Sequence, residues 1–231
     1  MKIAQPKIRN LIISTFTLLL MCSSSNSQKF NILIIGDSIS IGYTPYVAAS
    51  MKNIANIIHN DGNAQSSSNG VSNIKRWIGS TKWDIIQFNF GLWDLAYRRA
   101  GTTKLDKKDG VLTATPAEYK ANLELIVQEL IKTNAKLIFV KTSYVPVDEL
   151  GRFVGDEDIY NAVALEVMNK YGITVNDITP ESKNIHLQNG LGTNNVHYNA
   201  AGYQQLASLI TAGLNKILVG ITPKNITSKA D

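Results

Sequence analysis

The sequence predicts an α/β protein in which five short strands form one parallel sheet. From residue 30 onward, short apolar runs alternate with longer segments of helical periodicity, as expected when helical crossovers join parallel strands. The chain has 231 residues, 44% of them hydrophobic and 18% charged, which is enough for one sizeable core. Its single cysteine excludes an intramolecular disulfide framework, so the fold must depend on that core.

Each predicted strand is a short apolar run. The first is interrupted only by Asn31, and the third is the longest. Such continuous apolar character is typical of strands that are buried on both faces of a sheet. The five predicted strands cover residues 30–35, 54–58, 83–90, 136–142 and 173–176.

Capping residues and apolar stripes predict three helices between and after these strands. Thr115, Pro116 and Glu118 supply a hydroxyl at the N-cap, a proline at the first helical position and a glutamate at N3. This capping box opens a helix that should end near residue 133. A second helix is predicted over residues 158–171, and a third begins after Asn199, a natural N-cap.

The first 27 residues have the layout of a secretory signal peptide. Basic residues precede an apolar run over residues 11–21, which is short for a membrane span, and a small polar stretch follows. Cleavage after Ser27 leaves Gln28 at the new N-terminus; lipid attachment at Cys22 and an uncleaved anchor are the alternatives. Met21 argues against lipidation, because bacterial lipoprotein signals usually carry a small residue there. The folded domain is predicted over residues 28–221, followed by a polar tail over 222–231.

Charge and composition exclude several classes of partner. Removal of residues 1–27 lowers the formal net charge from +5 to +2, and no long basic stripe with interleaved aromatic residues remains. Nucleic acid is therefore not a predicted partner. The three histidines and the cysteine lack zinc-ligand spacing, so no metal is predicted. No pattern predicts an oligomeric state.

Ser38 and His197 are the candidate nucleophile and base. Ser38 follows the first predicted strand, and ligands of open parallel sheets bind beyond the carboxyl ends of strands. The segment lacks the glycine pattern and the lysine of nucleotide-binding loops, although an ordinary N-cap serine stays an alternative. His197 stands just before the last predicted helix. Its imidazole can accept the serine proton and later protonate the leaving group. The other two histidines are assigned no role.

Taken together, these residues resemble the motifs of the SGNH, or GDSL-type, hydrolases, a superfamily of esterases and lipases. Gly36–Asp37–Ser38 is similar to the first block of the family, and Val196–His197 to the last. Asn69–Gly70 resembles the second block, and Gly91–Asp94 stands where the family usually has Gly-x-Asn-Asp. The resemblance covers most of the mature chain. It implies a three-layer, flavodoxin-like α/β/α sandwich that hydrolyses esters through an acyl-serine intermediate, without a metal or organic cofactor.

The resemblance also assigns residues around the nucleophile. Ser38, Gly70 and Trp93 are the predicted oxyanion-hole residues. Trp93 replaces the usual asparagine donor; its indole N–H is one substitute, the Asn89 amide is another, and a role as a wall of the cleft is the alternative. The candidate substrate-binding residues are Asp37, Asn89 and Asp94.

The expected acid of the triad is missing. The family has an aspartate three positions before the histidine, whereas this chain has Asn194. An amide can hydrogen-bond the imidazole, but it cannot stabilise the imidazolium and can favour the wrong tautomer. In serine proteases the equivalent replacement lowers turnover about 10⁴-fold. A backbone carbonyl, Asp177 or Glu181 are the alternative partners of the imidazole.

The sequence therefore predicts an exported serine esterase that removes small acyl groups, acetyl in particular, from carbohydrate. The loops near the site are mostly polar, which favours a small-molecule or polysaccharide ester over a lipid. The basic run that starts at Arg98–Arg99 either favours an anionic polysaccharide or is a solvated surface. Asn194 and Trp93 support a second hypothesis, a catalytically silent glycan-binding or scaffold protein with the same fold.

Overall fold

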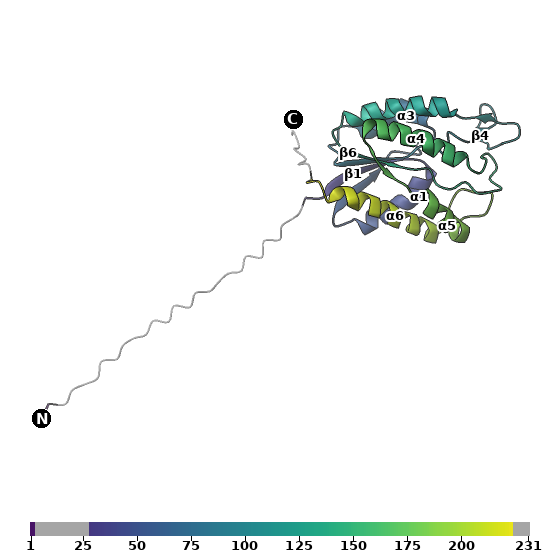
Figure 1. The fold of residues 1–231 in the computed structure, drawn as a ribbon. Coiled ribbons are helices and arrows are strands. Elements are labelled where there is room, and N and C mark those ends of the chain that lie inside the picture. The colour runs from purple at the N-terminus through teal and green to yellow at the C-terminus, as the bar shows by residue number, and fades with distance from the viewer. Residues whose placement is uncertain (3–27, 224–231) are drawn as a thin grey trace.

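The structure of the protein, a computed structural model, describes residues 1–2 and 28–223 (Figure 1). Nearly all of the predicted signal peptide, including Cys22, and most of the predicted tail lie outside the described residues. Within the described part of the chain, no helix combines the length and the apolar composition that crossing a bilayer requires.

A parallel sheet of five strands forms the centre of the fold, as predicted. Its order is β2-β1-β3-β6-β7, so the connections run in opposite directions on the two sides of β1 and β3. In open α/β sheets such a switch point leaves a crevice at the carboxyl ends of the two strands. The strands are β1 (Phe30–Ile35), β2 (Ala55–His59), β3 (Ile85–Phe88), β6 (Lys136–Val140) and β7 (Thr174–Asn176).

Helices cover both faces of the sheet and complete the predicted three-layer sandwich. α2 packs on α3 and α3 on α4, whereas α1 and α5 both pack on α6. Figure 1 shows α3 and α4 on one side of the sheet and α1, α5 and α6 on the other. The helices are α1 (Ser38–Ser50), α2 (Ser67–Ile78), α3 (Pro116–Ile131), α4 (Asp156–Tyr171), α5 (Thr179–Asn189) and α6 (Ala200–Leu218).

The predicted capping residues start α3 and α6. Thr115 accepts a hydrogen bond from the backbone N–H of Glu118 at 3.3 Å, and the Glu118 carboxylate accepts from the backbone N–H of Thr115 at 2.7 Å. The side chain of Asn199 accepts from the N–H of Gly202 at 3.0 Å. These bonds satisfy amides that the first turn of a helix leaves without partners.

Helices α1, α2 and α5 were not predicted, because their residues are poor helix formers. α1 contains Gly42 and Pro45. A Cβ atom at Gly42 would lie 2.1 Å from the ring of Tyr203 in α6, so the close approach of the two helices requires glycine there. Tertiary packing therefore outweighs the low helix propensity of this segment.

β3 is shorter than the predicted run of residues 83–90, because the chain leaves the sheet after Phe88. Pairing with β1 and β6 ends at that residue. Gly91 then adopts a φ of 147°, and a Cβ there would lie 2.0 Å from the hydroxyl of Thr142. The turn that follows leads into a small antiparallel hairpin of β4 (Tyr97–Arg98) and β5 (Val111–Leu112).

Candidate active site

Ser38 stands at the N-terminus of α1, directly beyond the end of β1. The side chain of Asp37 caps the helix by accepting a hydrogen bond from the N–H of Ile39 at 2.9 Å. As a first-turn residue, Ser38 has a backbone N–H without an intrahelical partner, at the positive end of the helix dipole. The hydroxyl is half-buried and lines an open cleft.

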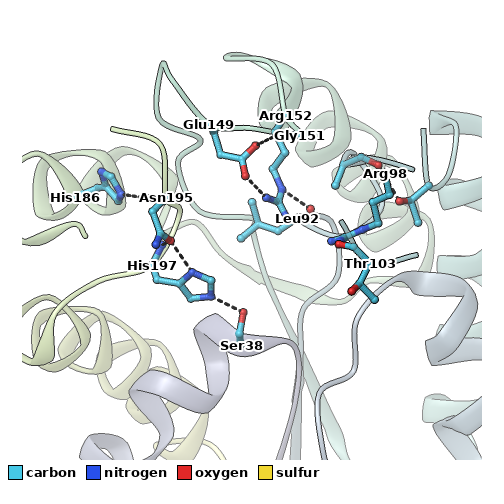
Figure 2. Close-up of polar contacts among 12 residues, drawn as sticks. Ser38, Leu92, Arg98, Thr103, Glu149, Gly151, Arg152, His186, Asn195 and His197 are labelled. Atoms are coloured by element: carbon cyan, nitrogen blue, oxygen red, sulfur yellow. Dashed lines mark hydrogen bonds and ion pairs between the residues drawn. The ribbon is translucent and has the colours of Figure 1, made fainter. Parts of the chain in front are cut away.

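The structure brings His197 to Ser38 across 159 positions of sequence. His197 lies in the loop between α5 and α6, and its Nε2 is 2.8 Å from Ser38 Oγ (Figure 2). Burial lowers the pKa of His197, the nearby Arg152 lowers it further, and Glu149 partly offsets both. The imidazole is therefore neutral at pH 7, the state in which it can accept a proton.

Asn195 holds the other side of the imidazole, so the prediction that Asn194 does so is wrong. His197 Nδ1 lies 2.7 Å from Asn195 Oδ1, which also accepts from the backbone N–H of His197 at 3.0 Å. This short turn directs the side chain of Asn195, two positions before the histidine, toward the imidazole ring. Asn194 is exposed and lines the same cleft. Lys141 binds Asp177 at 2.5 Å, and no carboxylate bonds to the imidazole among the described residues.

The two contacts to Asn195 determine the tautomer of His197. A backbone N–H can only donate, so the amide atom facing it must be the oxygen. The same oxygen faces Nδ1, which must therefore carry the ring proton. Nε2 is left with its lone pair directed at Ser38, as a general base requires. The amide therefore favours the productive tautomer.

His186 supports this loop from α5. Its Nε2 lies 2.7 Å from the carbonyl oxygen of Asn195, as the dashed line in Figure 2 shows. Because a carbonyl only accepts, this nitrogen carries the proton. His59, the third histidine, lies 2.7 Å from the hydroxyl of Ser40, a residue that is only 2% exposed. The sequence assigned neither histidine a role; His186 bonds to the loop that carries His197, and His59 reaches Asp37 through the hydroxyl of Ser40.

The structure contradicts the predicted role of Gly70 in the oxyanion hole. Gly70 lies inside α2, and its N–H donates to the carbonyl of Ser66 at 3.0 Å. A Cβ there would lie 2.6 Å from the ring of Phe90. The glycine therefore allows α2 to approach the core closely. Asn69 and Gly70 both lie near the start of this helix.

Asp94 and Asn89 are hydrogen-bonded within the protein, and neither is among the residues that line the cleft. Asp94 is fully buried, and its Oδ1 accepts from the N–H of Ser67 at 2.9 Å and from its hydroxyl at 2.5 Å. Burial raises the pKa of Asp94 to about 7, although the bonds from Ser67 lower it. Asn89 donates to the carbonyl of Val140 at 2.7 Å. Substrate binding by these two residues stays a prediction; in the structure Asp94 anchors the N-terminus of α2.

An open cleft of about 400 Å³ connects the nucleophile to solvent. Ser38 and His197 form one side, and the turn after β3, the β4–β5 insertion and the segment before α4 form the others. Trp93, a predicted donor or wall, lines this cleft beneath the guanidinium of Arg98, which is 3.9 Å from the ring centroid. Asp37 also lines the cleft but is 2% exposed, and burial raises its pKa.

A buried ion pair that the sequence did not reveal lies in the wall of the cleft. Arg152 Nη1 donates to Glu149 Oε1 at 2.7 Å, and Arg152 Nε donates to the carbonyl of Leu92 at 2.6 Å (Figure 2). Glu149 Oε2 accepts from the N–H of Gly151 at 2.7 Å. The segment before α4 and the turn after β3 are thereby held together. The two residues lie three positions apart, a spacing that does not by itself signal such a pair.

Comparison with known proteins places this geometry in a known fold. No family model matches the chain, and no curated protein matches its sequence. Solved structures do match. The chain has the fold of the SGNH hydrolases. That assignment confirms the fold that the sequence motifs predicted.

Three of the matching structures show how far the similarity extends. The acetyl xylan esterase AlAXEase aligns with a TM-score of 0.66 and 15% identity, over 80% of this chain and 100% of that one. Axe2, an acetylxylan esterase from Geobacillus stearothermophilus, aligns with a TM-score of 0.65 and 16% identity, over 81% of this chain and 95% of that one. A lipase/acylhydrolase from Enterococcus faecalis aligns with a TM-score of 0.64 and 20% identity, over 85% of this chain and 99% of that one. At these identities the shared property is the SGNH fold.

Proposed function

We propose that this protein is a serine esterase that removes small acyl groups, acetyl in particular, from carbohydrate. The observation that carries the proposal is the 2.8 Å contact between Ser38 Oγ and a neutral His197 whose tautomer is set by Asn195. A hydroxyl next to an oriented imidazole is the arrangement that nucleophilic acyl transfer needs.

The first half of the reaction forms an acyl-serine. Ser38 Oγ attacks the ester carbonyl while its proton passes to His197 Nε2. The negative charge that develops on the carbonyl oxygen lies near the N-terminus of α1, where the backbone N–H of Ser38 donates to it. The protonated imidazole then gives its proton to the departing sugar hydroxyl, and the C–O bond breaks.

The second half releases the acid. Water enters through the open cleft, His197 accepts one of its protons, and the oxygen attacks the acyl carbon. Collapse of this intermediate breaks the bond to Ser38 Oγ, which regains its proton from the imidazole. Both halves pass through an imidazolium that the neutral Asn195 orients but does not stabilise by charge, so the proposed enzyme has a weakened triad.

The proposed substrate class follows from the cleft and from the similar structures. The cleft is open and small, with both apolar and charged walls, which suits a short acyl group on a polar carrier. Two of the structures that share the fold are acetyl xylan esterases. Residues 1–27 support export, by secretion or with a lipid at Cys22, so a carbohydrate outside the cytoplasm is the proposed target.

Hydrolysis of a chromogenic acetyl ester tests the proposal. Wild-type protein should release acetate, and Ser38→Ala should reduce the rate to the uncatalysed background. A fluorophosphonate probe should label Ser38 in the wild type, as seen by peptide mass spectrometry. Equal rates for wild type and Ser38→Ala, together with an unlabelled Ser38, would contradict esterase activity.

The second candidate function is a catalytically silent glycan-binding or scaffold protein. Asn195 favours it, because this amide occupies the place where an acid would stabilise the imidazolium. Calorimetric titration with xylan and pectin fragments should then detect binding while no acetate is released. Turnover that depends on Ser38 would exclude this alternative.

A further inference from the structure

Two guanidinium groups enter the cleft from different parts of the chain. Arg98 comes from β4 and Arg152 from the segment before α4, and both line the cleft that contains Ser38 and His197. In Figure 2, Arg98 lies across the site from the Ser38–His197 pair. Arg152 is paired with Glu149 at 2.7 Å, whereas Arg98 forms no ion pair within the described residues.

Arg98 is held in position but has an unused donor. Its guanidinium lies 3.9 Å from the centroid of the Trp93 ring, and its Nη1 donates to the carbonyl of Thr103 at 2.5 Å. Its Nε is buried and has no hydrogen-bond partner in the described part of the protein. Because Nε is shielded from solvent, an acceptor in the cleft would bind the terminal nitrogens of the guanidinium instead.

The cleft also holds two neighbouring cations. Burial and the neighbouring Arg152 together lower the pKa of Arg98 to about 10, although Glu149 raises it, so Arg98 remains a cation at neutral pH. Glu149 pairs with Arg152. Asp37, the other carboxyl of the cleft, caps α1 and interacts electrostatically with Arg152, so neither carboxyl forms an ion pair with Arg98. An anionic group next to the ester would relieve the repulsion between the two arginines.

We propose that Arg98 selects ester substrates whose sugar carries a carboxylate or a sulfate. This inference rests on the proposed esterase function and names its substrate class more closely. A guanidinium presents several N–H donors in one plane, which matches the oxygens of either anion. Because Trp93 and Thr103 already orient the group, little side-chain entropy is lost when the anion binds.

The test compares three acetylated monosaccharides that differ only at carbon 6. These are acetylglucose, acetylglucuronate and acetylglucose 6-sulfate, with the acetyl group at the same position in each. Wild-type kcat/KM should be about tenfold higher for one or both anionic esters than for acetylglucose, equivalent to 1.4 kcal/mol. Arg98→Gln should reduce this ratio to about one. The anionic ester with the higher kcat/KM shows whether the site selects a uronate or a sulfated sugar.

Arg99→Gln is the matched control. Arg99 is the next residue but is exposed and pairs with Asp106 at 2.6 Å. Its removal should leave the ratio at the wild-type value. Arg98→Lys keeps the charge without the planar fork and should keep part of the preference. Thermal unfolding of each variant shows whether it is folded.

Three results would overturn the inference: no preference in wild type, a preference that Arg98→Gln retains, or one that Arg99→Gln removes equally. If acetylglucose is hydrolysed through Ser38 without any anion preference, the esterase proposal stands and the inference fails. If no ester is hydrolysed, the esterase proposal fails. Titration of Ser38→Ala with glucuronate and glucose then decides the inference: tighter glucuronate binding that depends on Arg98 supports it, and equal affinities overturn it.

Discussion

At the scale of single residues, the main chemical question is how a neutral amide serves where a carboxylate is expected. Asn195 Oδ1 accepts from both the ring and the backbone N–H of His197, and this double contact leaves Nε2 as the acceptor for Ser38. The orientation of the base is thus preserved. What the amide lacks is the charge that would stabilise the imidazolium formed in both halves of the reaction.

Asn195→Asp should therefore accelerate the proposed reaction. The carboxylate keeps the acceptor geometry and adds a negative charge beside the imidazolium. The gain in kcat should be about 10- to 100-fold, less than the 10⁴-fold effect in serine proteases, which includes the wrong tautomer. Steady-state hydrolysis of an acetyl ester measures it. Asn194→Asp, on the exposed neighbour, is the matched control, and an equal gain in that variant would contradict the role of Asn195.

The pH dependence of the rate should follow the ionisation of His197. Because burial and Arg152 lower its pKa from 6.5, kcat/KM should rise with pH to a plateau, with the midpoint below pH 6.5. Asn195→Asp should move the midpoint to higher pH, because the new charge favours the imidazolium. A wild-type midpoint above pH 7 would contradict this assignment of the base.

At the scale of elements, two contacts between helices and their surroundings hold the site in place. α1 carries Ser38 and packs on α6, which follows the loop that carries His197. α2 is anchored at its N-terminus by Asp94, from the turn that lines the cleft with Trp93. Each of these contacts can be weakened by a single substitution far from the reacting atoms.

Gly42→Ala should destabilise the protein. The added Cβ would lie 2.1 Å from the ring of Tyr203 and force α1 away from α6. Overpacking of this kind costs about 1–3 kcal/mol, measurable as a lower free energy of unfolding in urea. Gly220→Ala is the control, because the nearest atom to its added Cβ is a carbonyl oxygen 3.9 Å away. Equal stability of Gly42→Ala and wild type would contradict the close packing.

Asp94 should make stability fall as pH rises through the range from about 4 to 7. Its pKa is raised from 3.8 to about 7 in the folded state, so the folded protein holds a proton that the unfolded chain releases in this range. Asp94→Asn removes that contribution. The difference in Tm, wild type minus variant, should be larger at pH 5 than at pH 8. A difference independent of pH would contradict the raised pKa.

At the scale of the whole molecule, the sheet could be predicted from sequence, whereas the loops at its carboxyl edge could not. Buried parallel strands are continuous apolar runs, and α3 and α6 begin at readable caps. α1 contains Gly42 and α2 contains Gly70, and both glycines are needed for close packing. Because glycine has a low helix propensity, these residues make the two helices hard to predict from the sequence. The resemblance assigned the Gly70 amide to the oxyanion hole, whereas this N–H is used inside α2.

The residues of the candidate site could also be predicted only in part. The nucleophile and the base could be named from their position after a strand and before a helix. Asn195 could not be distinguished from Asn194, because the choice depends on the backbone of one turn. Arg98 was visible only as part of a charge run. That it enters the cleft while Arg99 stays on the surface follows from the β4–β5 hairpin.

Export is the prediction that concerns the chain as a whole. In a bacterial host that secretes the protein, the intact mass of the exported form should correspond to residues 28–231, because residues 1–27 have the layout of a cleaved signal. A lipid-modified N-terminus at Cys22 would replace secretion by anchoring. An exported form that retains residues 1–27 would contradict cleavage.

The 159 positions that separate Ser38 from His197 also determine when, during synthesis of the chain, the site can form. A ribosome must synthesise the chain as far as residue 197 before the imidazole exists, and α6 must then dock beside α1. Nascent chains that end before residue 197 therefore lack the serine–histidine pair. The proposed chemistry can begin only after that point of synthesis.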